Sequence, residues 1–540
     1  MLNVGSIGDV PSLAARVRGR RTALIHHDNK QTYDDLDHAV SRLAARLRQL
    51  GVARGERVAL FMENRPEYLF AYFAVPAAGG VLVPLNTFLA AAELEEMLLD
   101  SGATTLLTSP EALPRIAPAL RKLQHMRDVV LFGESSHEPA MVPFHMQLTC
   151  FRESQADDEA KVAGEPTLLV PEGDDTAVLI YTSGTTGRPK GVMLTHRNLL
   201  SNAEACIEAV GVTQNDRLLL CLPMFHSFTE MVGMLAPVVA GMSIILLDKL
   251  DRAQVKRALL RHRPTIFPAV PAVFAAMSQV KLGPIARWMN PVRLYISGGA
   301  PLSLDTLRRF EQIYGRPLCE GYGLSEASPV VALNPPSGPR KAGSVGLPLP
   351  GVDVMVADEA GRNMASEETG ELLVAGPSVM KGYLERPEET SRALRGGWLH
   401  TGDFARRDGD GYLFIMGRAK EMLICRGMNV YPREIEDVLE GDPRVKEAAV
   451  IGVPDAGRGE VPVAFVVRGP GERLTESELK RVCVERLARY KVPRTIHFVE
   501  ALPRNAAGKI LKQSLAASGS GTTLQAGAPP AGQAARERQP

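Results

Sequence analysis

The sequence predicts an α/β protein: a large N-terminal domain with helix-covered sheets and a small β unit, hinged to a small α+β C-terminal domain. Three observations lead to this prediction. Up to about Gly346, apolar β-branched runs such as RVALFM, TAVLIY and RLYIS alternate with loops and helix-like segments. This alternation favours substantially parallel sheets covered on both faces. After that point the strands become short and closely spaced, and from about Glu421 helices and strands alternate again in a compact module.

The domain boundaries follow from these changes of pattern. A chain of 540 residues corresponds to about three or four folding units. We place the N-terminal domain at residues 1–416. Within it, VDVMVAD, GELLVAG and GYLFIMG predict a mainly antiparallel β unit at about residues 347–416. The C-terminal module covers residues 421–515, and the Ala/Gly/Pro-rich tail at 516–540 is expected to be disordered.

The composition favours small-molecule chemistry. The net charge is +1, so no broad positive field is available to hold nucleic acid, and we expect no nucleic-acid partner. The six cysteines form no CxxC pair and do not cluster with histidine. This pattern argues against a disulfide framework or a structural zinc site and fits a reducing cytoplasm. The N-terminus lacks the apolar core of a signal peptide.

Two stretches, residues 68–92 and 231–247, are long and uncharged enough to be candidate membrane spans. Both are interrupted by proline and glycine, so each is better interpreted as an apolar helix, a glycine turn and a buried strand. We expect no transmembrane span. Peripheral contact with a membrane and oligomer formation both remain open.

A loop suited to polyphosphate follows the predicted strand TAVLIY. Gly184 and Gly187 allow backbone N–H groups to approach an anion closely. Hydroxyl donors come from Thr182, Ser183, Thr185 and Thr186, and Lys190 adds a positive charge. The alternative is an ordinary polar surface loop.

This loop is not a Walker A motif, because only two residues separate its glycines and Lys190 precedes Gly191. A short strand, VML, is expected next, before Thr195 caps the helix HRNLLSNAEACIEAV. The phosphate would therefore be held by a loop between two strands and not by a helix dipole.

Four further motifs are ambiguous when taken one at a time. LYISGGAPLS offers bare backbone against which a flat ring can lie, but it also fits a simple strand-to-helix turn. EGYGLSEAS combines an aromatic face with a hydroxyl and a carboxylate, which suit adenine, phosphate and Mg²⁺. In WLHTGDF, Asp403 is able to accept hydrogen bonds from both ribose hydroxyls, or is a turn residue. Lys509 alone is a solvated charge, and His226 alone is a core histidine.

In their order along the chain, from about Thr32 to Lys512, these motifs resemble the adenylate-forming superfamily of acyl-CoA synthetases, peptide-synthetase adenylation domains and luciferases. The resemblance implies that a small-molecule carboxylic acid is activated by ATP as acyl-AMP, with release of pyrophosphate. The acyl group then passes to the thiol of coenzyme A. ATP, Mg²⁺ and coenzyme A are therefore the expected cofactors.

The resemblance also assigns roles to residues. It makes Tyr322 the adenine platform, Ser325 a phosphate ligand and Glu326 the Mg²⁺ ligand. Asp403 is assigned to the ribose, and Arg418 to the ribose and the phosphate. The full ATP- and AMP-binding set that it implies is Thr182, Ser183, Gly184, Thr185, Thr186, Gly187, Lys190, Gly298, Gly299, Ala300, Glu320, Gly321, Tyr322, Gly323, Ser325, Asp403 and Arg418.

The remaining implied roles concern catalysis and domain movement. Lys509 is catalytic in adenylation, where its ammonium stabilises the charge that develops around the α-phosphate. Residues 417–420, GRAK, match the family's hinge with Lys420 as the pivot, and Gly427 allows the pantetheine arm of coenzyme A to pass. Ile424 stands where some relatives carry a lysine.

The implied acyl pocket contains His226, Phe228, Val270, Gly298 and Gly299. His226 is expected to admit and orient the carboxylate and is not proposed as a base. LPMFHSF followed by an apolar run resembles bacterial medium- and long-chain fatty acid ligases. Glu230 does not suit a fatty tail, so it either points away from the pocket or marks a polar or shorter acid.

Three alternatives remain open. The first is a CoA ligase for an aryl or short branched acid. The second is a stand-alone adenylating enzyme that loads a separate carrier protein. The third is a non-catalytic binding protein, against which the joint presence of Glu326, Asp403, Arg418 and Lys509 argues.

Overall fold

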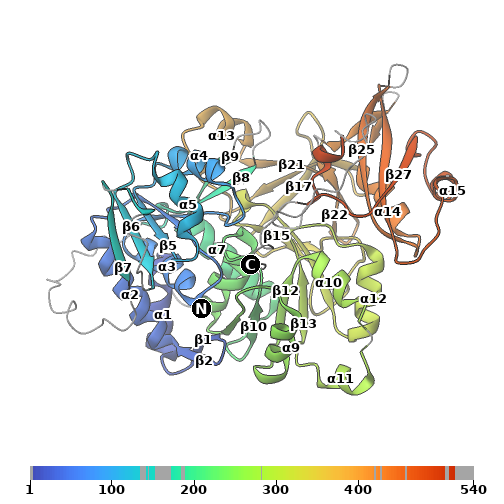
Figure 1. Cartoon of the computed structure of the whole chain (residues 1–540). Helices are drawn as coiled ribbons and strands as arrows, with labels where there is room; N and C mark the ends of the chain where they lie inside the picture. Colours follow the sequence, from blue (N-terminus) through green and yellow to red (C-terminus); the bar gives the residue numbers. More distant parts are fainter. Residues whose placement is uncertain are drawn as a thin grey trace, which may run out of the picture. The chain divides into compact units, whose positions relative to one another are not determined.

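The computed structural model describes residues 4–133, 141–143, 145–151, 172–183, 189–280, 282–418, 421–425, 428–455, 459–504 and 510–516. The chain divides into two compact units, of which the larger is essentially Met1–Ala419 and the smaller begins at Lys420 (Figure 1). Its mixed α/β architecture is the predicted fold class.

The larger unit contains a nine-stranded sheet whose central strands are parallel. In spatial order its strands are β16 (Leu347–Pro348), β15 (Val330–Leu333), β14 (Leu318–Gly323), β13 (Leu294–Ser297), β12 (Ile266–Ala269), β10 (Arg217–Leu220), β11 (Ser243–Leu246), β1 (Thr22–His26) and β2 (Asn29–Thr32). The helices that follow or connect these strands include α7 (His196–Val210), α8 (Ala236–Ala240), α9 (Arg252–Arg261), α10 (Pro271–Met277), α11 (Pro284–Met289) and α12 (Leu304–Tyr314).

A second, eight-stranded sheet combines parallel strands with one antiparallel edge. In spatial order its strands are β19 (Gly382–Tyr383), β9 (Pro189–Thr195), β8 (Thr176–Ser183), β4 (Val81–Pro84), β3 (Arg57–Phe61), β5 (Thr105–Thr108), β6 (Asp128–Phe132) and β7 (Gln147–Phe151). Its helices are η1 (Ile7–Asp9), α1 (Val10–Arg18), α2 (Tyr33–Gln49), α3 (Pro66–Ala77), α4 (Ala91–Ser101) and α5 (Leu113–Leu120).

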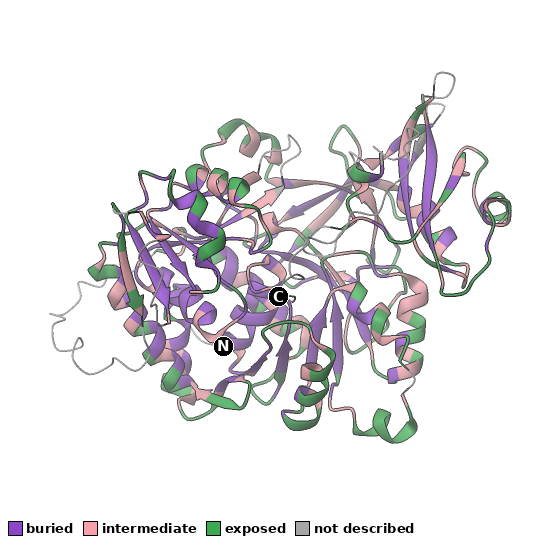
Figure 2. Ribbon diagram, in the orientation of Figure 1, coloured by how far each residue is buried: buried purple, intermediate pink, exposed green. Residues whose placement is uncertain are grey.

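The two sheets and the helices that cover their faces form five layers. Successive side chains of a strand point to opposite faces, so Val58 and Leu60 of β3 join one buried cluster while Ala59 and Phe61 join another. The first cluster also contains residues of α2, α3 and α7 and of the nine-stranded sheet. Those helices therefore lie between the sheets, with α4 and α5 on one outer face and α9, α10 and α12 on the other. Figure 2 shows the purple buried strands and inner helices.

The predicted antiparallel β unit is present. Its strands are β17 (Asp353–Ala357), β18 (Thr369–Ala375), β20 (Leu394–Arg395), β21 (Trp398–Arg407) and β22 (Leu413–Arg418), and the helix α13 (Pro387–Ala393) precedes β20. Every pairing within this sheet is antiparallel.

The smaller unit has its own sheet and core. Its elements are β23 (Leu423–Cys425), β24 (Met428–Val430), α14 (Pro432–Glu440), β25 (Val445–Asp455), β26 (Gly459–Arg468), α15 (Glu476–Arg486), β27 (Thr495–Val499) and α16 (Lys512–Ala516). The predicted order of helix, two strands and amphipathic helix is found here. Residues of the sheet pack with α14 and α15 in one buried cluster.

Both candidate membrane spans, residues 68–92 and 231–247, form the expected helix, turn and strand. Residues 68–76 of α3 are all buried, and β4 follows after a glycine turn. In the second stretch a π-helical segment, η3 (Thr229–Leu235), runs into α8 and then β11. Among the described helices, none has the length and apolar character needed to cross a bilayer.

Candidate active site

The predicted phosphate loop joins two antiparallel strands. In the register of β8 and β9, Thr182 lies opposite Lys190. Thr195 caps α7 by accepting a hydrogen bond from the backbone N–H of Asn198. The predicted strand between loop and helix is therefore confirmed. Gly184, Thr185, Thr186, Gly187 and the side chain of Ser183 lie outside the described residues.

Lys190 contacts one acidic and one aromatic side chain from other elements. Its ammonium forms an ion pair with Glu389 of α13 and lies 5.2 Å from the ring centroid of Tyr383 in β19. The hydroxyl of Tyr383 donates to Oε1 of Glu326 at 3.0 Å. Glu326 and Ser325 belong to the short helix η4 (Ser325–Ala327). The fold thus brings the expected phosphate lysine and the expected metal ligand into one network.

Tyr383 and Glu389 are not among the site residues that the sequence predicts. They lie in KGYLERPEET, which reads as a short strand running into a helix with charged residues in its first turn. Nothing in that pattern marks it as part of a site, because its partners come from remote parts of the chain.

Three predicted nucleotide ligands meet at the end of β14. The hydroxyl of Tyr322 donates to Oδ2 of Asp403 at 2.6 Å. Nε of Arg418 lies 3.1 Å from Oδ1 of the same carboxylate, because Asp403 and Arg418 are opposite each other in β21 and β22. A carboxylate offers about four acceptor positions. Two of them therefore remain free of these contacts, enough for a pair of ribose hydroxyls.

The turn after β13 contains the predicted residues Gly298, Gly299 and Ala300. Gly299 has φ of 82°, a left-handed conformation that favours glycine. A Cβ on Gly298 would lie 3.0 Å from the ring of Phe228. These two glycines therefore allow the turn to lie directly against the aromatic ring.

Glu320 of β14 has a supporting role for this turn. Its side chain is buried, and Oε1 accepts a hydrogen bond from the backbone N–H of Leu302 at 2.9 Å. Gly323, at the end of the same strand, lies so close to Pro329 that a Cβ would be 2.1 Å from its carbonyl oxygen. Both residues therefore shape the backbone around Tyr322.

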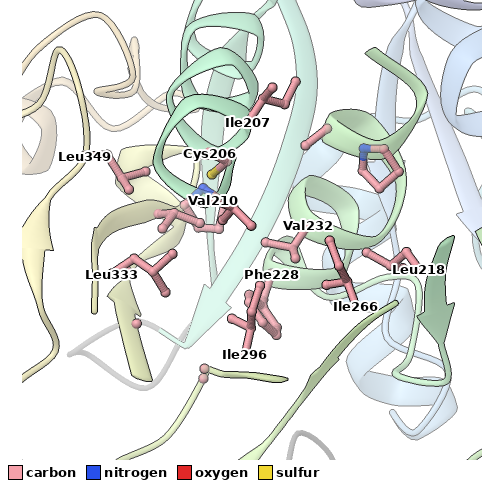
Figure 3. A pocket seen from close by; sticks show the side chains of 18 of the residues that line it. Cys206, Ile207, Val210, Leu218, Phe228, Val232, Ile266, Ile296, Leu333 and Leu349 are labelled. Atoms are coloured by element: carbon pink, nitrogen blue, oxygen red, sulfur yellow. The ribbon is translucent and has the colours of Figure 1, made fainter. Parts of the chain in front are cut away.

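An apolar cavity opens beside this turn and Tyr322 (Figure 3). The end of the cavity beside the β13 turn and Tyr322, here called its mouth, is lined by His226, Ser227, Phe228, Ser297, Gly298, Gly299, Gly321, Tyr322 and Gly323. The rest of its wall is formed by Cys206, Ile207, Val210, Val212, Leu218, Val232, Ala236, Pro237, Met242, Ile266, Ile296, Pro329, Val330, Leu333 and Leu349. The expected pocket residues His226, Phe228, Gly298 and Gly299 thus lie together. Val270 is not part of this lining.

His226 has the chemistry of a hydrogen-bond donor at the mouth. The backbone N–H of Phe228 donates to Nδ1 of His226 at 3.3 Å, which leaves Nε2 to carry the proton of the neutral ring. Burial lowers the pKa of His226, so the ring is neutral at physiological pH. This state suits orientation of a carboxylate.

Glu230 is absent from the lining of the cavity. It is buried in η3, and neither carboxylate oxygen has a hydrogen-bond partner among the described residues. Burial raises its pKa well above the usual range, which favours the neutral acid. Burial raises the pKa of Tyr68 and Tyr72 in α3, and a charge on Glu230 would raise it further. Glu230 therefore gives no reason to expect a polar acid.

Three predicted residues, Lys420, Gly427 and Lys509, lie outside the described residues. Ile424, where some relatives carry lysine, is half exposed in β23.

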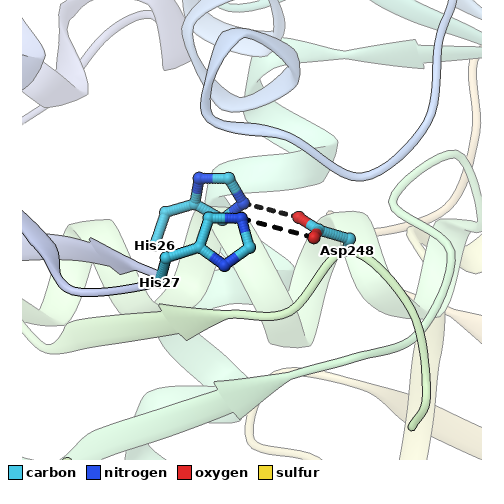
Figure 4. Close-up of side chains that lie close together, drawn as sticks. All are labelled: His26, His27 and Asp248. Carbon is cyan, nitrogen blue, oxygen red and sulfur yellow. Dashed lines mark hydrogen bonds and ion pairs between the residues drawn. The ribbon is translucent and has the colours of Figure 1, made fainter. Parts of the chain in front are cut away.

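A separate cluster lies where β1 and β11 end. Nε2 of His26 is 2.6 Å from Oδ1 of Asp248, and Nε2 of His27 is 3.4 Å from Oδ2 (Figure 4). Because both imidazoles already face one carboxylate, the cluster is satisfied without an ion. It links the β1–β2 hairpin to the segment after β11.

Comparison with known proteins identifies the family. The chain matches the family described as AMP-binding enzyme over residues 12–384 and its C-terminal domain over residues 434–509. The feruloyl-CoA synthase of an Amycolatopsis species is 39% identical over 517 residues, covering 95% of this chain and 98% of that protein. A long-chain-fatty-acid–CoA ligase of Bacillus subtilis is 35% identical, covering 92% and 91%. The crystal structure of ATP-bound MatB from Rhodopseudomonas palustris matches with a TM-score of 0.82 at 33% identity, covering 94% and 98%.

The chain therefore belongs to the AMP-binding enzyme family, the adenylate-forming superfamily that its motifs resemble. Within that superfamily it lies in the acyl-CoA synthetase branch. It is an AMP-forming acyl-CoA synthetase, an enzyme that joins a carboxylic acid to coenzyme A with ATP.

Proposed function

We propose that this enzyme activates fatty acids, with medium-chain acids of about ten to twelve carbons as the best fit. The supporting observation is the cavity. Its polar groups, including the His226 ring and the hydroxyls of Ser227 and Ser297, gather at the mouth, and its inner wall is aliphatic apart from the sulfur atoms of Cys206 and Met242. A monocarboxylic acid with an apolar tail matches this division, because its charge stays at the mouth and its tail is buried.

The length of the cavity is given by two distances, one along the sheet and one along η3 and α8. In the sheet, Ile266 lies opposite Leu294 and next to Leu218, three residues before the level of Ser297, or about 10 Å at 3.3 Å per residue. In η3 and α8, the lining residues Phe228 and Ala236 are eight residues apart, at most about 12 Å at 1.5 Å per residue. An extended peptide covers about 3.3 Å in three backbone bonds, so 10–12 Å holds roughly nine to eleven bonds, which corresponds to about ten to twelve carbons.

The nucleotide site is proposed from the meeting of Tyr322, Asp403 and Arg418. Tyr322 would carry the adenine ring, and the free acceptor positions of Asp403 would receive the ribose hydroxyls. Lys190 and the loop before it would hold the β- and γ-phosphates. Glu326 would bind Mg²⁺, which prefers oxygen ligands. Its hydrogen bond from Tyr383 is made at Oε1, and Oε2 has no hydrogen bond from another residue in the part of the chain that the structure describes.

The proposed reaction then uses these groups in sequence. His226 orients the carboxylate at the mouth of the cavity, and the carboxylate oxygen attacks the α-phosphorus of ATP. Pyrophosphate leaves and acyl-AMP remains. Lys509 stabilises the charge on the α-phosphate during this step. The thiol of coenzyme A then attacks the acyl carbon and releases AMP.

We also propose the two domains and the hinge that the sequence indicates. Residues 417–420 would allow the C-terminal domain, residues 421–515, to present Lys509 for adenylation and the segment around Gly427 for thiol attack. The unpaired cysteines support a reducing, cytoplasmic location.

An aryl acid is the second candidate, because the feruloyl-CoA synthase shares the higher identity. Its phenol would need a polar partner inside the cavity, and an unpaired hydroxyl is costly to bury. The aliphatic inner wall argues against such an acid.

The test is coenzyme-A- and ATP-dependent release of AMP across straight-chain acids from acetate to stearate, with benzoate, cinnamate and ferulate in parallel. We expect the highest kcat/KM at about ten to twelve carbons. A maximum at ferulate or benzoate would contradict the proposal. Pyrophosphate exchange that responds to amino acids, without thioester formation from coenzyme A, would instead support a carrier-loading enzyme.

A further inference from the structure

Four side chains around the proposed phosphate site form a continuous network. Glu389 pairs with Lys190, whose ammonium also lies over the ring of Tyr383, and the hydroxyl of Tyr383 donates to Glu326. They come from α13, β9, β19 and η4. Lys190 and Glu326 have expected nucleotide roles, whereas Glu389 has none.

Glu389 differs sharply from its neighbour on the same helix. The Glu388 side chain is 85% exposed and pairs with Arg392 one turn along α13. The Glu389 side chain is 24% exposed and faces Lys190, whose own side chain is only 12% exposed. An ammonium group with so little contact with water needs a counter-charge. The carboxylate of Glu389 supplies it.

Glu389 is ionised while it does so. The ammonium of Lys190 lowers the pKa of Glu389, and Arg386, 3.6 Å away, acts in the same direction. Arg386 is itself paired with Asp100 at 3.1 Å. The ammonium of Lys190 therefore faces a full negative charge before any phosphate arrives.

This arrangement sets up a competition. A phosphate oxygen that pairs with Lys190 must share its three N–H donors with Glu389, and the two anions repel each other. We propose that Glu389 is a positioning residue that holds Lys190 at the phosphate site and competes with the β- and γ-phosphates for it, which weakens the hold on pyrophosphate and speeds its release. This inference rests on the proposed phosphate role of Lys190.

The competition predicts an unusual sign for a substitution. Glu389→Gln keeps the shape of the side chain but removes its charge, so the site becomes more positive by one unit. We expect the Kd of ATP and the Kd of pyrophosphate to fall by about three- to fivefold, the upper part of the range measured for exposed ion pairs, because both side chains are largely buried. Glu388→Gln, the same change on the exposed neighbour, is expected to leave both constants within about twofold.

Binding is measured by isothermal titration calorimetry without the acid substrate, so that no turnover occurs. Glu389→Asp keeps the charge and should bind ATP and pyrophosphate as the parent does. In a double-mutant cycle, Lys190→Ala should weaken binding, and adding Glu389→Gln to it should have no further tightening effect, because the contested ammonium is gone. Pyrophosphate should also inhibit the Glu389→Gln enzyme more strongly than the parent.

The possible outcomes distinguish the phosphate role of Lys190 from the competition by Glu389. Unchanged binding in Lys190→Ala refutes the proposed phosphate role of Lys190. Weaker binding in Lys190→Ala, together with unchanged or weaker binding in Glu389→Gln, overturns the competition and leaves the phosphate role intact. Equal tightening by Glu389→Gln in the parent and in Lys190→Ala also overturns it, since the effect would then not pass through Lys190.

Discussion

The inner end of the acyl cavity offers the sharpest test of the proposed substrate. Phe228, Val232 and Ala236 are four residues apart along η3 and α8, and all three line the cavity. Phe228 lies against Gly298 at the mouth, so Ala236 marks the inner end of this row. Ala236→Phe would fill that end with a phenyl ring and shorten the space for the acyl tail.

The expected fall in kcat/KM follows from the number of methylenes that can no longer be buried in the cavity. If the ring displaces about three or four methylenes, each worth about 0.8 kcal/mol when buried, the loss is roughly 2.4–3.2 kcal/mol. That corresponds to a fall of about 50- to 200-fold in kcat/KM for decanoate. Butyrate does not reach Ala236, so its kcat/KM should change by less than about threefold.

The assay compares decanoate with butyrate in continuous AMP release. Ala240→Phe is the matched control, because Ala240 is the last residue of α8 and lies outside the lining of the cavity. Thermal unfolding confirms that each variant is folded at the assay temperature. An unchanged ratio of decanoate to butyrate in folded Ala236→Phe would refute the assigned direction of the acyl tail, and equal loss on both acids would show general damage to the site.

Three other predictions concern the nucleotide, the first half-reaction and stability. Asp403→Asn should raise the KM for ATP by at least about tenfold, because the charge that pairs with Arg418 and would hold the ribose is lost; an unchanged KM in acid-dependent pyrophosphate exchange would contradict this. Lys509→Ala should abolish adenylation and leave thiolysis of preformed acyl-AMP largely intact, and full adenylation activity would remove Lys509 from the catalytic assignment. His196 accepts a hydrogen bond from the backbone N–H of Ile7, and burial lowers its pKa from 6.5 to about 4. As the pH falls, His196 is protonated in the unfolded chain before it is protonated in the folded one. The free energy of unfolding should therefore be at its full value above about pH 6.5 and fall by about 3 kcal/mol towards pH 4. Denaturant unfolding of His196→Gln should show a weaker dependence on pH, and an equally steep dependence would contradict the assignment to His196.

Much of the fold was predictable because it depends on local patterns. The period-two and helical patterns, with the turn residues between them, predicted the α/β units and the antiparallel β unit. The capping residue Thr195 fixed the start of α7, and so indicated a strand between the phosphate loop and that helix. The order of the motifs identified the superfamily, because each motif carries its chemistry in a short stretch.

The acyl pocket was only partly predictable. The resemblance placed Val270 in it, but Val270 is absent from the lining, and it left two directions open for Glu230. The π-helical segment η3 changes which side chains share a face, because its hydrogen bonds span five residues instead of four. Side-chain direction along residues 229–235 therefore cannot be read from an α-helical period.

The sequence by itself determined the class of enzyme, the order of its elements and the chemistry of its loops, since these depend on residues close together in the chain. Tertiary structure decided which of those residues act on one another. It pairs Glu389 with Lys190, brings Tyr383 into hydrogen-bond contact with Glu326, and places aliphatic side chains of several helices and strands around one cavity. Such contacts join segments up to about 200 residues apart, and only the packing of sheets and helices brings them within reach of each other's charges.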